Sequence, residues 1–125
     1  MTHSTSLNVY EEQLQACCFE PKTGWYRDGF CHTDQDDTGV HTVCVVVNQE
    51  FLTFSKSVGN DLSTPSPWFI GLKPGDKWCL CAARWQEAFD AGCAPQVFMD
   101  ATHIRTLDNT KFEDLERHSM YPSKP

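Results

Sequence analysis

The cysteines constrain the fold of this chain most, because cross-linked and free thiols stabilise small proteins in different ways. Seven occur in 125 residues: Cys17, Cys18, Cys31, Cys44, Cys79, Cys81 and Cys93. Residues Met1 to Leu7 carry neither the basic nor the apolar stretch of a signal peptide. We therefore expect a cytoplasmic or other reducing intracellular compartment, in which the thiols stay reduced and are buried as small apolar groups.

A disulfide framework is the alternative for these cysteines. In an exported chain six of them could pair and one would remain free, with fifteen possible pairings among any six. The spacing of the cysteines does not select one pairing. The reduced state is our prediction, and observed disulfides would contradict it.

The length, the composition and the charge of the chain limit the classes of function that it can have. The 125 residues suit one domain, and 40% apolar residues suffice for a core. The formal net charge of −7 argues against nucleic-acid binding through a basic surface. No apolar run approaches the roughly 18 residues of a membrane span. We divide the chain into an N-terminal extension (1–16), a single globular domain (17–120) and a tail (121–125).

A β-hairpin is predicted near the middle of the chain. Residues 40–47 are rich in β-branched side chains, residues 48–50 form a tight connection, and the stretch 51–54 supplies the second arm. The two-residue period of a strand places Val43, Val45 and Val47 on one face and Cys44 on the other, with Thr42 and Val46. His41 belongs to the Val43 face.

Turn residues and periodicity predict the remaining elements. Pro74 and Gly75 occupy the two central positions of a type II turn, and a strand follows over 77–80. Trp85, Ala88 and Phe89 follow helical spacing in a helix that begins at Ala82 and ends before Gly92. A strand is expected over 96–101, and a Thr-x-x-Glu capping box at 110–113 opens a second helix to about residue 118. Residues 20–24 and 32–39 are expected to be turn and loop, and 59–67 not to be helical.

These elements predict an α+β fold. We expect a small, loop-rich two-layer sandwich with an antiparallel or mixed sheet and one or two helices packed on it. Leu7, Tyr10, Leu14 and Cys17 also follow helical spacing, which indicates a further short helix before the double cysteine.

Strong metal and catalytic motifs are absent from the sequence. No paired Cys-x-x-Cys motif is present, and no metal site is predicted. The stretch Asp34-x-Asp36-x-Thr38-Gly39 starts like a calcium loop, but the twelfth position is a valine, so we expect a solvated turn. Gly-rich phosphate loops and nucleophile elbows are also missing.

The junction between strand and helix at residues 74–87 carries the best candidate chemistry. Cys79 and Cys81 precede the predicted helix, where the helix dipole favours a thiolate. Arg84 lies in the first helical turn, where a cation opposes the dipole and needs an anionic partner. That partner is either a bound anion or, in the structural interpretation that we favour, the carboxylate of Asp28, Asp61 or Asp76.

Several stretches together resemble a known family. They are Cys17-Cys18-x-x-Pro21-x-Thr23-Gly24-x-Tyr26-Arg27-Asp28-Gly29, His41-Thr42-Val43-Cys44, Gly59-Asn60-Asp61-Leu62-Ser63-Thr64-Pro65, Gly71-Leu72-Lys73-Pro74-Gly75-Asp76-x-Trp78-Cys79-Leu80-Cys81-Ala82-x-Arg84-Trp85-x-Glu87-Ala88 and Thr102-His103. The chain resembles the uncharacterised, largely bacterial family known as domain of unknown function 2237. The resemblance implies a small α+β domain without an assigned activity, substrate or cofactor, and an extended chain before the double cysteine. A departure is Phe30, where the family implies a further cysteine.

These observations leave three alternative functions, each of a different class. The first is a non-catalytic binding or interaction module that holds a small anionic or polar ligand near a helix N-terminus. The second is a thiol enzyme or redox protein with Cys79 or Cys81 as nucleophile and His41 or His103 as base. The third is an accessory subunit of a larger complex, whose acidic surface matches a basic partner. The binding module is our prediction, with no catalytic residue and no assigned cofactor. Its candidate residues are Arg27, Asp28, Asn60, Asp61, Trp78, Cys79, Cys81, Arg84, Trp85 and His103.

Overall fold

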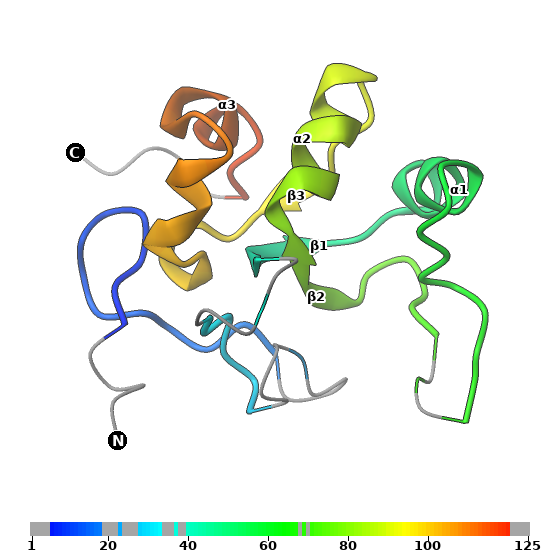
Figure 1. Cartoon of the computed structure of the whole chain (residues 1–125), viewed down its shortest axis with the longest axis horizontal. Helices are drawn as coiled ribbons and strands as arrows, with labels where there is room; N and C mark the ends of the chain where they lie inside the picture. The colour runs from blue at the N-terminus through cyan, green and yellow to red at the C-terminus, as the bar shows by residue number, and fades with distance from the viewer. Residues whose placement is uncertain are drawn as a thin grey trace.

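The computed structural model describes residues 6–18, 23, 28–33, 37, 40–67, 69 and 71–120. Its sheet has three antiparallel strands, β1 (His41–Val46), β2 (Lys77–Cys81) and β3 (Gln96–Val97), in the order β2-β1-β3. Figure 1 shows the labelled α-helices on one side of the strands and the N-terminal segments on the other. The predicted α+β class with an antiparallel sheet is confirmed.

One face of the sheet carries the main apolar core. Val43 and Val45 of β1 lie opposite Leu80 and Trp78 of β2, and all four side chains are buried. Residues of the α-helices cover this face, among them Trp85, which is fully buried. The predicted alternation along β1 is confirmed, since Val43, Val45 and Val47 belong to this core.

The opposite face of the sheet carries a smaller cluster. Cys44 lies directly opposite Cys79 in the strand register, and both are buried with Cys17, Cys31 and Ala101. Neighbouring residues on a strand point to opposite faces, so the valines and the cysteines of β1 enter different clusters.

Helix α2 (Ala82–Asp90) confirms the predicted helix. It begins directly after β2 and buries Ala82, Trp85 and Ala88. Gly92 follows it with a φ of +81°, a left-handed conformation common just past a helix end. The turn before β2 is also confirmed, because the Asp76 N–H donates to the Lys73 carbonyl at 3.0 Å and Gly75 has a φ of +98°.

The predicted second arm of the hairpin is wrong, because residues 51–54 lie inside helix α1 (Gln49–Ser57). Asn48 caps this helix: its side chain accepts a hydrogen bond from the Phe51 N–H at 2.7 Å. Phe51, Leu52 and Ser55 are buried, a spacing that fits a helical face. An apolar run of four residues does not distinguish strand from helix, and Asn48, placed in a turn, is equally a preferred N-cap residue.

The C-terminal elements differ from the prediction in detail. Only Gln96–Val97 of the predicted strand 96–101 is a strand, and Met99–Ala101 forms the 3₁₀ helix η2. A second 3₁₀ helix, η3, covers Ile104–Asp108. Helix α3 (Phe112–Arg117) confirms the second predicted helix, but the capping box is not formed. The Thr110 hydroxyl donates to Gln86 of α2 instead.

The remaining predicted segments are irregular where the structure describes them. Residues 59–67 contain no helix, as predicted. Residues 6–18 also form no helix, which agrees with the extended chain implied by the family resemblance, and Val9 of this segment lies in the main core. The predicted turn 20–24, the calcium-like stretch 34–39 and the tail 121–125 lie wholly or largely outside the described residues.

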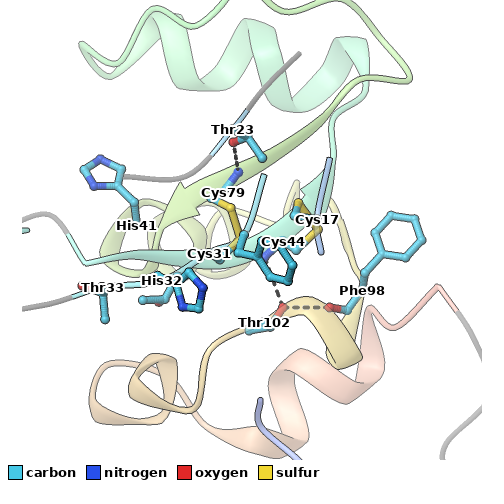
Figure 2. Close-up of a disulfide and its surroundings, with 12 residues drawn as sticks. Cys17, Thr23, Cys31, His32, Thr33, His41, Cys44, Cys79, Phe98 and Thr102 are labelled. Atoms are coloured by element: carbon cyan, nitrogen blue, oxygen red, sulfur yellow. Dashed lines mark hydrogen bonds between the residues drawn. A yellow bond between two sulfur atoms is a disulfide. The ribbon is translucent and has the colours of Figure 1, made fainter. Parts of the chain in front are cut away.

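The prediction of reduced thiols is wrong for four cysteines. Cys17 pairs with Cys44 and Cys31 pairs with Cys79, with Cα atoms 5.7 and 5.3 Å apart (Figure 2). The partners are 27 and 48 residues apart in the chain, so spacing alone could not reveal them. Two disulfides do not favour the predicted reducing compartment. Among the described residues, no helix is long and apolar enough to cross a membrane.

Candidate functional site

A cavity of about 370 Å³ lies along the outer edge of the sheet, beside β2. Four consecutive β2 residues, Trp78 to Cys81, line it, because β2 is the edge strand in the order β2-β1-β3. The other walls come from β1, from α2 and from the segment after α1: His41, Asn60, Asp61, Leu62, Phe69 and Arg84. The fold thereby brings together six of the ten predicted binding residues, namely Asn60, Asp61, Trp78, Cys79, Cys81 and Arg84.

Aromatic side chains form an apolar part of the cavity wall. The rings of Phe69 and Trp78 meet edge to face, with centroids 5.1 Å apart. Leu62 and Phe69 are partly buried and pack against the main core. This wall offers an apolar surface beside the polar groups, a combination typical of small-molecule pockets.

Arg84 supplies a positive charge to the cavity. Its Nη1 lies 3.2 Å from Glu87 Oε1 and 3.2 Å from the Val58 carbonyl oxygen, so the side chain links α2 to the end of α1. The predicted clamp is therefore present, but its carboxylate is Glu87 of the same helix, and not Asp28, Asp61 or Asp76. Both contacts use Nη1, one of the three guanidinium nitrogens.

Asp61 brings a negative charge to the same cavity. Its Oδ1 accepts hydrogen bonds from the backbone N–H groups of Ser63 and Thr64, at 3.0 and 3.2 Å, as in an Asx turn. A hydrogen bond from the Thr64 side chain, followed by that from the Ser63 backbone, lowers the pKa of Asp61 to about 2. The Asp61 carboxylate is therefore ionised at neutral pH, and the cavity offers both signs of charge.

An imidazole held by a buried carboxylate lies on the strand opposite Cys81, a free cysteine. The Asp37 side chain is fully buried, and its Oδ1 lies 2.6 Å from His41 Nδ1, while its Oδ2 accepts the His41 backbone N–H at 2.8 Å. The Thr33 hydroxyl donates to the same Oδ2 at 2.9 Å. His41 is the cross-strand partner of Cys81, and both line the cavity. Cys81 is also the N-cap residue of α2.

Four predicted site residues do not line this cavity or cannot be placed. Arg27 lies outside the described residues. The Asp28 carboxylate accepts the Phe30 N–H at 3.0 Å and lies 3.8 Å from His32 Nε2. Trp85 is a core residue whose indole N–H donates to the Pro95 carbonyl at 3.2 Å. His103 is buried at the start of η3, where its Nδ1 accepts the Arg105 N–H.

One residue of the candidate site, Asp37, was not predicted from the sequence. The polar composition of the stretch 32–39 predicts a solvated loop, whereas Asp37 is 2% exposed. The only signal in the sequence is the spacing of Thr33, Asp37 and His41 at four-residue intervals. Leu62, Phe69 and Leu80 were also missed as cavity residues, because apolar side chains give no chemical signal in the sequence.

Comparison with known proteins places the chain in a family. None of the curated proteins matches it. A family model described as "uncharacterized protein conserved in bacteria" matches residues 7–119, which is most of the chain and includes every described residue that lines the cavity. The chain therefore belongs to the bacterial family of domain of unknown function 2237 (DUF2237).

Proposed function

We propose that the chain is a binding module whose cavity beside β2 holds a small polar ligand with an anionic group. The volume of about 370 Å³ lies at the lower end of the range for small-molecule pockets, roughly 300 to 1,000 Å³. The observation that carries the proposal is the convergence of Arg84, Asn60 and Asp61 with an aromatic wall in one cavity.

Each cavity group has a separate part in this proposal. The N–H groups on the other guanidinium nitrogens of Arg84 donate to the anionic group of the ligand. The ionised carboxylate of Asp61 accepts from a donor group on the same ligand. Phe69 and Trp78 cover its apolar part. A ligand that carries an anion and a hydrogen-bond donor on a small apolar frame, such as an amino-acid-like zwitterion, meets all three requirements.

Ligand-induced thermal stabilisation tests the binding proposal. At about 100 times its Kd a ligand stabilises the folded state by about 2.7 kcal/mol, a rise of roughly 10 °C for a domain of this size. We expect such a rise with a member of a panel of carboxylates, phosphates and zwitterions at low ionic strength. Arg84→Ala should abolish it, measured against that variant's own ligand-free melting temperature.

Arg105→Ala is the matched control, because Arg105 is an exposed arginine that pairs with Asp108 away from the cavity. It should keep the ligand-induced rise. A panel without any rise, or a rise that Arg84→Ala retains, contradicts the proposal.

A second candidate function is thiol chemistry at Cys81, favoured by one observation. Asp37 holds His41 through two hydrogen bonds, and His41 is the cross-strand partner of the Cys81 thiol. A thiol nucleophile, a base next to it and a carboxylate that orients the base form an arrangement typical of thiol enzymes. Cys79, the other predicted nucleophile, is held in a disulfide and does not qualify in the oxidised state.

Site-resolved alkylation distinguishes this candidate from simple binding. If His41 activates Cys81, the Cys81 thiol reacts with iodoacetamide at neutral pH faster than the Cys18 thiol, and His41→Ala slows Cys81 alone by about 10-fold or more. Cys93 is the internal control, since burial raises the pKa of its thiol and keeps it slow. Equal rates at Cys18 and Cys81 that do not change in His41→Ala would exclude the thiol function and leave the binding proposal untouched.

A further inference from the structure

Four cysteine side chains meet on the sheet face away from the main core (Figure 2). Cys44 and Cys79 come from neighbouring strands, and Cys17 and Cys31 from the N-terminal segments. The sulfur atoms of Cys17, Cys31 and Cys44 lie within 4.8 Å of one another, and Cys79 adds a fourth sulfur through its bond to Cys31. We propose that these four sulfurs, once reduced, bind one Zn²⁺ ion as a tetrathiolate site.

The separation of the sulfurs suits such a site. Zn²⁺ binds four thiolates tetrahedrally with Zn–S bonds of about 2.3 Å, which places neighbouring sulfurs about 3.8 Å apart. The sulfurs of Cys17, Cys31 and Cys44 lie within 4.8 Å of one another, and the sulfur of Cys79 is bonded to that of Cys31, so small movements bring all four to this separation. The two sulfurs of each disulfide reach it by side-chain rotation after their bond is broken.

The backbone at three of the four cysteines, Cys17, Cys44 and Cys79, is held by hydrogen bonds that do not involve sulfur. The Cys17 N–H donates to the Gly29 carbonyl at 2.7 Å. The Cys44 N–H donates to the Thr102 hydroxyl oxygen at 3.1 Å, and the Cys79 N–H to that of Thr23 at 2.8 Å (Figure 2). Reduction breaks none of these bonds directly, and on our proposal they keep the thiols gathered for a metal ion.

The access route and the local charge also fit a metal. A second cavity, of about 210 Å³, is lined by Cys17, Cys44, Phe98 and Lys77, and it leads to the cluster. Four thiolates and one Zn²⁺ leave a net charge of −2. The ammonium group of Lys77 lies 4.5 Å from the centroid of the Phe98 ring, on the same cavity, where a positive charge offsets that of the site.

The chemical steps balance with a dithiol as reductant. Two dithiol molecules break the two S–S bonds, supply four electrons and four protons, and leave as two disulfides, while the protein gains four thiols. Zn²⁺ then displaces the four thiol protons to solvent and forms four Zn–S bonds. The same four sulfurs thus alternate between two disulfides and one metal site.

The test starts from the full chain, reduced under anaerobic conditions and freed of the reductant. We expect it to take up one Zn²⁺ per chain by native mass spectrometry, and X-ray absorption to show four sulfur ligands at about 2.3 Å. The oxidised chain should take up none. A reduced chain that binds no zinc, or zinc bound mainly by nitrogen or oxygen ligands, overturns the proposal without any variant.

Variants then identify the ligands. Because loss of an outer-shell partner already weakens metal binding by about 10- to 100-fold, Cys17→Ser should weaken it by more than about 100-fold. Cys18→Ser and Cys93→Ser are the matched controls, since both residues are free cysteines outside the four-sulfur set. Undiminished zinc affinity in Cys17→Ser, or its loss in a control variant that remains folded by circular dichroism, assigns the ion to other ligands and overturns the site.

Discussion

At the scale of single residues, two aspartates, Asp37 and Asp61, lie in opposite environments. Asp37 and Asp61 both come from polar stretches with similar composition, yet Asp37 is buried against His41 while Asp61 is exposed and caps its own turn. Asp61 could be found from the sequence as a candidate carboxylate partner of Arg84, in one of the stretches that carry the family resemblance. Asp37 could not, because only tertiary packing makes a loop carboxylate a partner for a strand histidine.

The buried imidazole of His103 gives a prediction for acid stability. Burial, followed by electrostatic interactions with His32 and Arg105, lowers the pKa of His103 from 6.5 to about 4. The unfolded chain then binds a proton near pH 6.5, whereas the folded chain binds it only near pH 4. The contribution of His103 to stability is therefore complete above about pH 6.5 and falls as the pH falls to about 4.

Urea denaturation across this pH range measures the effect. The free energy of unfolding of wild type should decline between pH 6.5 and about 4 more steeply than that of His103→Gln, which cannot titrate at this position. Identical slopes for the two proteins would show that His103 is not protonated differently in the folded and unfolded chains.

At the scale of secondary structure, a helix or strand could be predicted from the sequence where residues typical of element ends, such as proline and glycine, mark its limits. Strand β2 and helix α2 were predictable because Pro74, Gly75 and Gly92 mark their limits and the apolar period changes at Ala82. Helix α1 was not, because Asn48-Gln49-Glu50 and the mostly apolar stretch 51–54 that follows are also typical of a turn and the second arm of a hairpin. In the structure the Asn48 side chain accepts the Phe51 N–H as an N-cap, a contact that belongs to the helix.

Helix α1 therefore depends on its N-cap in a way that can be measured. Replacing Asn48 by alanine removes the acceptor for the Phe51 N–H and should cost about 1 kcal/mol in the free energy of unfolding. Asn48→Asp keeps an acceptor oxygen and should lose much less. Chemical denaturation of the three proteins gives the comparison, and equal stability of wild type and Asn48→Ala would argue against the cap.

At the scale of the whole molecule, the two disulfides connect segments without regular structure to two neighbouring strands of the sheet, the central strand β1 and the edge strand β2. Cys17 and Cys31 come from the N-terminal part, and their partners lie side by side on β1 and β2. Trp78 and the charged groups Asp61 and Arg84 of the cavity could be predicted from the sequence, whereas Phe69, the other half of the aromatic wall, could not. The pairing could not, because each disulfide joins residues that only the folded sheet brings together. Assembly with a basic partner, which the acidic charge suggested, stays a prediction.

Reduction should therefore weaken the molecule markedly. The chain-entropy relation gives about 3.5 kcal/mol for a 27-residue loop and about 4 kcal/mol for a 48-residue loop. Because the loops overlap, the two values do not simply add, and we expect reduction to lower the free energy of unfolding by at least about 3 kcal/mol.

Urea denaturation with and without a phosphine reductant, in the presence of a metal chelator, measures this loss. Cys93→Ser is the control, since Cys93 is free and should respond to reduction as wild type does. An unchanged urea midpoint after complete reduction would show that the cross-links do not stabilise the native state.

The overlap of the two covalent rings also determines how the protein responds to a protease. Cys31 lies between Cys17 and Cys44 in the chain, and Cys44 lies between Cys31 and Cys79. A single cut in the polar stretch 32–39 therefore falls inside both rings, and each ring still joins the two fragments. The nicked protein stays in one piece until both bonds are reduced, so cleavage there is invisible on a non-reducing gel.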